Sequence, residues 1–163
     1  MRITRDGRFE RTDIWREGKW LDLWSVVHFL SGMSVGFGFY FVGFPAPVAV
    51  VIAFLSFTAY EIWEARVGIE ETPTNRFMDV VVGMVSFLPI FFILAPALSR
   101  PLDILTFGFV LTANIVMSTF GWVASRKATV LEERTRTRYA RSRERLLERA
   151  THLRERIHRQ NDQ

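Results

Sequence analysis

Four ionisable side chains stand out because they lie at one depth inside three long apolar stretches, where a charge is costly and usually serves a function. They are His28, Glu61, Glu64 and Asp79. An imidazole with two or three carboxylates suits a divalent metal that activates water, an acid/base pair for lipid-headgroup chemistry, or a proton or cation relay. It equally suits a structural network in which His28 pairs with a carboxylate. All of these interpretations stay open at this point.

The spacing of the polar residues predicts that they share helix faces. One face of the first apolar stretch carries Ser25, His28, Gly32 and Gly36. Glu61 and Glu64 are three residues apart, and Asn75 and Asp79 are four apart, which places each pair on one side of a helix. Small residues on such a face let a neighbouring helix approach closely. The candidate catalytic or metal-ligating residues are His28, Glu61, Glu64 and Asp79, and the residues expected to support them are Tyr60 and Asn75.

The elements that must position these residues are four apolar stretches. They span residues 24–44, 46–65, 77–98 and 101–125. Each is close to the roughly 20 residues that a helix needs to cross about 30 Å of hydrocarbon. In a bilayer only helices and closed barrels satisfy their backbone groups, and these stretches are too long for barrel strands. The sequence therefore predicts an all-α, polytopic membrane protein with four transmembrane helices.

Positive charge is strongly segregated along the chain. Of the 21 Lys and Arg residues, only Arg100 falls on one side of the predicted membrane. Because basic loops stay on the cytoplasmic side, we expect both termini to be cytoplasmic. At 1.5 Å per residue, the four candidate residues then lie within roughly 2–6 Å of the cytoplasmic interface. The Trp residues expected to form an interfacial belt there are Trp15, Trp20, Trp24, Trp63 and Trp122.

Composition and charge also define the expected domains. The chain has 163 residues and no Cys, and its charges are segregated, which excludes a disulfide-stapled secreted domain and a soluble globule with a mixed surface. We expect a cytoplasmic or interfacial segment over 1–23, a transmembrane domain over 24–125, and an Arg-rich cytoplasmic helical tail over 126–163.

The tail, residues 126–163, carries 12 basic and six acidic side chains. Its first half, Arg126–Arg141, is expected to contact anionic lipid headgroups. Its apolar stripe predicts weak pairing with another helix, which belongs either to a second copy in a homo-oligomer or to another subunit of a membrane complex. The stripe consists of Tyr139, Leu146, Ala150, Leu153 and Ile157. Nucleic acid is disfavoured as a partner because the tail has a single aromatic residue and no known reading module.

Three other positions have structural interpretations. Asn114, near the middle of the fourth stretch, is expected to hydrogen-bond between helices. Asp103 is expected to help cap the fourth helix. Pro89 is expected to kink the third.

Several short motifs resemble the VanZ-like superfamily over residues 24–98. They are His28-Phe29, Tyr60-Glu61-Ile62-Trp63-Glu64, and Asn75-Arg76-Phe77-Met78-Asp79 followed by Gly83. The chain departs from that family before His28, where the family has Asp-Lys, at Glu64, where it often has Gln, and in its long tail. The resemblance implies a small bacterial inner-membrane protein linked to the cell envelope or its lipids, with no settled reaction. An accessory or scaffold subunit and a small transporter or relay are the alternatives.

Overall fold

The computed structural model describes the backbone of residues 2–3, 9–10, 15, 20–67 and 71–161, and the side chains of residues 15, 20–67 and 71–146. Within these residues the chain is helical apart from two short strands, β1 (Arg2–Ile3) and β2 (Phe9–Glu10), which pair antiparallel. The chain divides into two units. One consists of Ile14–Ser125 and contains the candidate site. The other consists of Met1–Asp13 and Arg126–Gln163.

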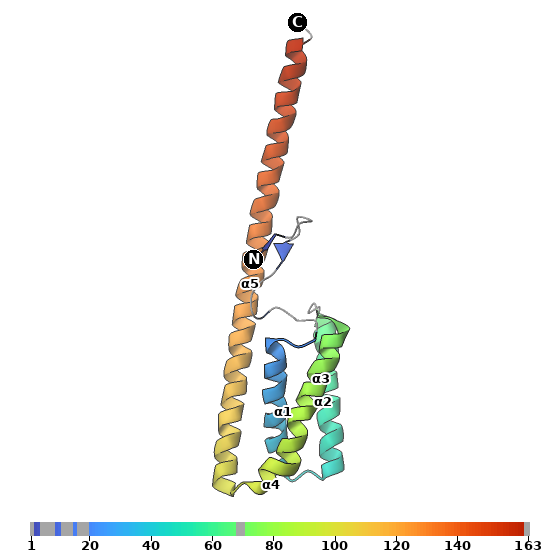
Figure 1. Ribbon diagram of the computed structural model, residues 1–163, viewed down its shortest axis with the longest axis vertical. Coiled ribbons are helices and arrows are strands. Elements are labelled where there is room, and N and C mark those ends of the chain that lie inside the picture. The colour runs from blue at the N-terminus through green and yellow to red at the C-terminus, as the bar shows by residue number, and fades with distance from the viewer. Residues whose placement is uncertain (1, 4–8, 11–14, 16–19, 68–70, 162–163) are drawn as a thin grey trace. The chain divides into compact units, whose positions relative to one another are not determined.

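The helices follow the predicted apolar stretches closely (Figure 1). They are α1 (Leu23–Val42), α2 (Ala46–Val67), α3 (Pro73–Pro89), the π-helical turn η1 (Ile90–Leu94), the short helix α4 (Ala95–Ala97) and α5 (Arg100–Asn161). Four helical segments are long and apolar enough to cross a membrane, as predicted: α1, α2, Pro73–Ala97 and the part of α5 up to Leu146. Many large apolar side chains on them face outward, and Phe109 is 75% exposed. Lipid, rather than water, suits such a surface.

Two predicted boundaries need correction. The third helix begins at Pro73 and not at Phe77, because Thr72 caps it and Pro73 occupies its first turn. The fourth helix does not end at Ser125, since α5 is helical from Arg100 to Asn161. The helical tail that the sequence predicts is therefore present as the second part of α5. Tyr139 and Leu146 of the predicted stripe are exposed, and its other side chains lie outside those that the structure describes.

Local sequence signals explain where α1 begins and ends. The carboxylate of Asp22 accepts hydrogen bonds from the backbone N–H groups of Trp24 (2.7 Å) and Ser25 (3.3 Å). The Ser25 hydroxyl accepts one in return from the Asp22 N–H, which completes a capping box. At the other end Gly43 has φ of +78°, a left-handed conformation that favours glycine. Pro45 then follows, just before α2 begins.

Helix α3 is defined by its cap and by its prolines. The Thr72 side chain accepts a hydrogen bond from the backbone N–H of Asn75 at 3.2 Å, as an N-cap residue does. At the far end Pro89 has no N–H to donate, and the helix widens directly afterwards into the π-helical turn η1. The disturbance expected at Pro89 thus takes the form of a π-turn.

Helices α1 and α3 pack together through glycines. A Cβ atom added at Gly32 would overlap the Gly83 carbonyl oxygen and the Ser86 hydroxyl. One added at Gly36 would lie 2.9 Å from the Ile90 side chain. On its other side Gly83 faces the Phe57 ring of α2, 3.2 Å from where a Cβ would stand. Helix α3 is therefore held between α1 and α2, and the predicted small-residue face of α1 is buried.

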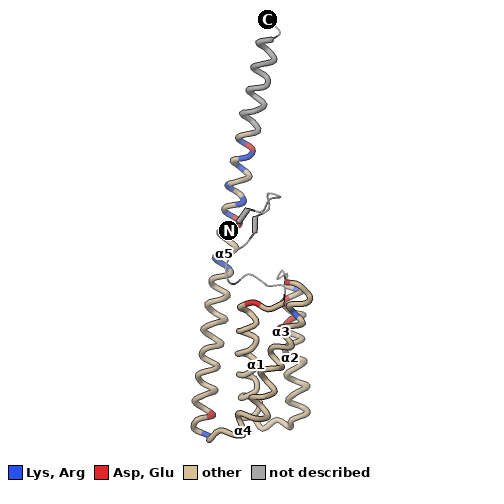
Figure 2. The backbone as a smooth tube through the Cα atoms, in the orientation of Figure 1, with Lys and Arg blue, Asp and Glu red and all other residues tan. Residues whose placement is uncertain are grey.

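Apolar side chains fill the rest of the interior. One cluster joins α2 to α3 and η1, and consists of Ala49, Ala53, Phe57, Phe87 and Phe91. A second joins α1 to η1, α4 and α5, and consists of Phe37, Ile90, Ala95 and Val110. Figure 2 shows that long stretches of α1, α2 and the first part of α5 carry no described Lys, Arg, Asp or Glu residue.

Side chains from α1 and the region before it contact α5. The Asn114 amide exchanges hydrogen bonds with the Ser31 hydroxyl at 3.1 and 3.3 Å, which confirms its predicted role between helices. Trp15 packs edge-on against Trp24 and Phe120, in a notch that a Cβ at Gly121 would fill. Trp15 is only 3% exposed, so it packs against its neighbours and does not present its ring at the surface as expected for an interfacial belt. Trp20, Trp63 and Trp122 are each more than half exposed.

The glycine contact gives the first testable prediction. Gly32→Ala should destabilise the protein by about 1–3 kcal/mol, because the added methyl group must push α3 away from α1. Gly38 lies on the same helix with no atom within 4 Å of its would-be Cβ, so Gly38→Ala is the matched control and should not destabilise. The measurement is the unfolding free energy of the detergent-solubilised protein. Equal stability of the two variants would contradict the close approach.

Candidate metal centre

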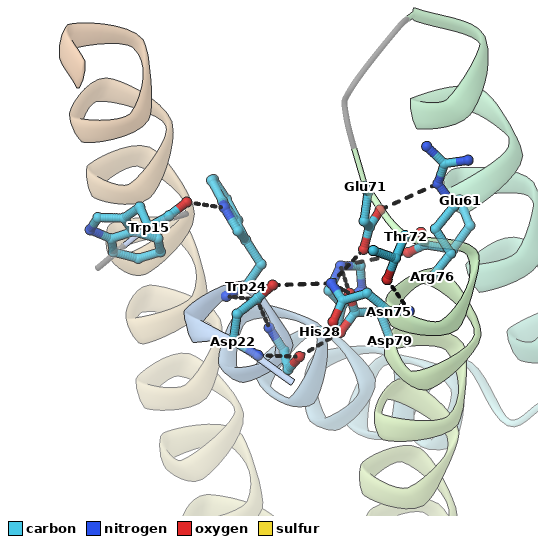
Figure 3. Close-up of polar contacts among 11 residues, drawn as sticks. Trp15, Asp22, Trp24, His28, Glu61, Glu71, Thr72, Asn75, Arg76 and Asp79 are labelled. Atoms are coloured by element: carbon cyan, nitrogen blue, oxygen red, sulfur yellow. Dashed lines mark hydrogen bonds and ion pairs between the residues drawn. The ribbon is translucent and has the colours of Figure 1, made fainter. Parts of the chain in front are cut away.

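Three helices bring His28, Glu61 and Asp79 together, and we name these residues the histidine group. They come from α1, α2 and α3 respectively. The His28 Nε2 atom lies 3.6 Å from Glu61 Oε1 and 3.9 Å from Asp79 Oδ2, and Figure 3 shows the three helices that carry them. All three residues are buried. The structure thus brings together three of the four residues that the sequence singles out.

The fourth predicted residue, Glu64, lies in a second and overlapping group. Glu61, Glu64 and Glu71 each place one carboxylate oxygen so that the three atoms lie within 4.8 Å of one another. We name these residues the glutamate group. Glu64 and Glu71 are half-buried. Glu61 belongs to both groups and connects them.

A hydrogen-bonded network fixes Asp79. The Ser25 hydroxyl donates to Asp79 Oδ1 at 2.7 Å, and the same hydroxyl accepts from the Asp22 N–H in the capping box of α1. The start of α1 is thereby tied to the buried face of α3. A short hydrogen bond of this kind to a carboxylate is stronger than one between neutral groups.

Asn75, which is fully buried, links three carboxylates. Its Nδ2 donates to Glu71 Oε1 at 2.6 Å, Asp22 Oδ2 at 3.0 Å and Asp79 Oδ2 at 3.3 Å. An amide nitrogen has only two hydrogens, so at least one of them is shared. Arg76 lies beside this network, with its Nε 3.4 Å from Glu71 Oε2. Asn75, which the sequence predicts as a supporting residue, thus contacts Glu71, Asp22 and Asp79.

Glu61 differs from the other buried carboxylates. It is 5% exposed, and neither of its carboxylate oxygens has a hydrogen-bond partner among the described residues. An ionised carboxylate removed from water without donors loses several kcal/mol of solvation. Glu61 therefore requires a proton or a cation, and the side chain turned towards it is the His28 imidazole.

The spacing of the donor atoms suits a shared metal ion better than direct hydrogen bonds. Distances of 3.6 and 3.9 Å from His28 Nε2 are too long for N–H···O bonds. Ligand atoms about 2.1 Å from one ion lie roughly 3.0–3.4 Å apart in octahedral or tetrahedral geometry. The two separations from His28 Nε2, 3.6 and 3.9 Å, exceed the upper end of this range by about 0.2 and 0.5 Å. One nitrogen and two carboxylate oxygens form a donor set for Zn²⁺, Mn²⁺ or Fe²⁺.

Some contributors to the site were not identified from the sequence. Asp22 and Glu71 border the apolar stretches, and Arg76 lies inside α3. Local signals mark two of them: the capping box from Asp22 to Ser25, and the spacing of four residues between Glu71 and Asn75. Tyr60, which the sequence does suggest as a supporting residue, places its ring edge-on to His28 at 5.8 Å between centroids.

Asp103 provides a comparison within the same unit. It lies in the first turn of α5 and is 1% exposed. Its Oδ1 is buried without a hydrogen-bond partner among the described residues, so the helix-capping role expected for it is not realised through that atom. Among the described residues it joins neither group of potential metal ligands.

Comparison of the chain with family models, with curated proteins and with solved structures finds no match.

The Ser25 contact gives a second prediction. Ser25→Ala removes the donor to Asp79 and should cost about 1.5–3 kcal/mol of unfolding free energy, the usual range for a hydrogen bond to a charged group. Ser34→Ala is the control, because the Ser34 hydroxyl donates only to the Leu30 carbonyl one turn earlier on the same helix. Unfolding of both variants in detergent compares them. A loss no larger in Ser25→Ala than in Ser34→Ala would refute the role of this network.

Proposed function

We propose that this protein is a divalent-metal-binding integral membrane protein, in which His28, Glu61 and Asp79 hold the metal. The observation that carries the proposal is the buried Glu61 carboxylate, whose oxygens have no hydrogen-bond partner among the described residues and which lies beside His28 Nε2. A divalent ion supplies the missing positive charge. It also uses the lone pairs that no donor occupies.

The metal would give the site a hydrolytic chemistry. Three protein ligands leave coordination positions for water and for a substrate oxygen, as in catalytic zinc sites. Such an ion would lower the pKa of a bound water, so that the water could act as a nucleophile near neutral pH, and it would polarise the group under attack. At the ends of transmembrane helices, the substrates within reach are phosphate or ester groups of lipid headgroups. Metal-assisted headgroup chemistry is therefore the enzymatic form of the proposal.

The two other classes have less support. A scaffold that associates through small residues needs them exposed, whereas Gly32 and Gly36 are buried against α3. A proton or cation relay needs polar groups along the whole path. Between the histidine group and Asp103, the described interior consists mainly of the two apolar clusters around Phe37 and Phe87.

The proposal includes a location and a family. We place the protein in the bacterial inner membrane because of its resemblance to the VanZ-like superfamily. We place both termini in the cytoplasm because 20 of its 21 basic residues then lie on the cytoplasmic side. This orientation puts Arg126–Arg141 beside the anionic leaflet, whose headgroups are the proposed partner of that segment. Membership of the VanZ-like superfamily rests on the motifs around His28, Glu61 and Asp79.

Metal binding gives the third prediction. The full chain in detergent, stripped with a chelator and titrated with Mn²⁺, should bind the ion, and Glu61→Gln should weaken that binding by at least about 100-fold. Replacing outer-shell partners already costs 10–100-fold in other sites, and Glu61 is proposed as a direct ligand. Asp103→Asn is the control, because it neutralises an equally buried carboxylate outside the site and should bind normally. Wild-type binding no tighter than that of Glu61→Gln would reject the proposal.

Topology gives the fourth prediction. The chain has no Cys, so single cysteines can be introduced and tested with a thiol reagent that does not cross membranes. In intact bacterial cells Pro45→Cys and Arg100→Cys should react, whereas Trp20→Cys and Asn161→Cys should react only after the membrane is opened. Labelling of Trp20→Cys or Asn161→Cys in intact cells would exclude the proposed orientation.

A further inference from the structure

Further carboxylates lie beside the histidine group. The histidine group, the glutamate group and Asp22 together contribute five carboxylates: Asp22, Glu61, Glu64, Glu71 and Asp79. Among the described residues, Arg76 pairs with one of them, Glu71. Carboxylate oxygens are the ligands that hard divalent cations prefer, and those outside the histidine group are available to a second ion.

The glutamate group offers a place for the second ion. Its three carboxylate oxygens lie within 4.8 Å of one another, and two of its members are already held in position. Glu71 accepts from Asn75 Nδ2 through Oε1 and pairs with Arg76 Nε through Oε2. Such outer contacts orient a ligating carboxylate and leave it further lone pairs for a metal. Glu64 is half-buried, so this group reaches the surface of the helical unit.

The position and burial of Glu61 also indicate that its carboxylate is a ligand shared by two ions. It is the only residue common to the two groups among the described residues, and both of its oxygens are buried without a hydrogen-bond partner there. One oxygen beside His28 would explain a single ion. A carboxylate with both oxygens unpaired is suited to bridge two ions, as carboxylates do in two-metal sites.

We propose that the site binds two divalent cations, with Glu61 as the bridging ligand. His28 and Asp79 complete the first position, and Glu64 and Glu71 complete the second. This inference rests on the proposed function, because it requires the first metal. The second position has only oxygen donors and therefore favours a hard cation such as Mn²⁺ or Mg²⁺. Paired ions about 3.5–4 Å apart typically clamp a phosphoryl group during displacement, so the substrate class is a phosphate ester or diphosphate.

The experiment is a stoichiometry measurement on the full chain in detergent. After chelator treatment, equilibrium dialysis against Mn²⁺ should give two tightly bound ions per chain for the wild type and for Asp103→Asn. Glu64→Gln, at a half-buried position, should give one. Glu61→Gln should give none or one weakly bound ion. Electron paramagnetic resonance of the wild type should show spin coupling between the two ions, and Glu64→Gln should show an isolated ion.

Each outcome separates the two claims. One ion per wild-type chain, or two ions without spin coupling, would overturn the bridged pair while leaving the proposed metal function intact. Two ions retained by Glu64→Gln would also overturn the second position. No bound ion in the wild type would overturn both proposals. Loss of one ion together with loss of spin coupling in Glu64→Gln would establish the pair.

Discussion

Repulsion between carboxylates that enter one buried space from different helices is the constraint on which this structure depends. Glu61 on α2 and Asp79 on α3 both approach His28 on α1, and each is almost fully removed from solvent. In a medium of low dielectric constant such groups repel strongly and lose hydration. The surroundings of the two carboxylates, Asp79 and Glu61, differ in the hydrogen bonds that they offer. Asp79 receives hydrogen bonds from Ser25 and Asn75, whereas Glu61 receives none within the described residues. The unequal treatment leaves Glu61 as the group on which an added cation would act most strongly.

The fold holds this arrangement by letting α1 and α3 come unusually close. Glycine at positions 32 and 83 allows backbone to meet backbone about one turn beyond the polar groups, so the residues one turn nearer the helix ends are forced together. The capping box at Asp22 and the Thr72 cap fix where the two helices begin, and Asn75 joins the two starts through Asp22. The caps, the glycine contact and the buried donors therefore belong to one construction. Its result is a set of oxygen and nitrogen ligands whose positions depend on backbone geometry rather than on flexible loops.

Much of this construction follows from the sequence by simple physical reasoning. Apolar length predicts the four helices, and spacing predicts the buried faces that carry His28 and Asp79, which the structure confirms. Depth in the membrane suggests that these residues lie at one level, but it does not determine which of them meet. Glu64 illustrates the difference: it is one turn from Glu61, yet it joins Glu71 and not His28, because the rotation of α2 is set by packing of Phe57 against Gly83. Trp15 shows the same limit. A Trp at this position suggests an interfacial belt. In the structure, however, its ring fills the notch at Gly121, and only the three-dimensional packing reveals that notch.

The central claim is that the His28 imidazole and the Glu61 and Asp79 carboxylates bind one metal ion. Pulsed electron paramagnetic resonance tests it most directly, using the full chain in detergent with less than one Mn²⁺ per chain. The chain contains three His residues, of which His152 and His158 belong to the tail. The account predicts a nitrogen coupling from a directly bound imidazole in the wild type and in a variant with both tail histidines replaced by Gln, and its loss in His28→Gln. A coupling that survives in His28→Gln, or none in the wild type, would contradict it.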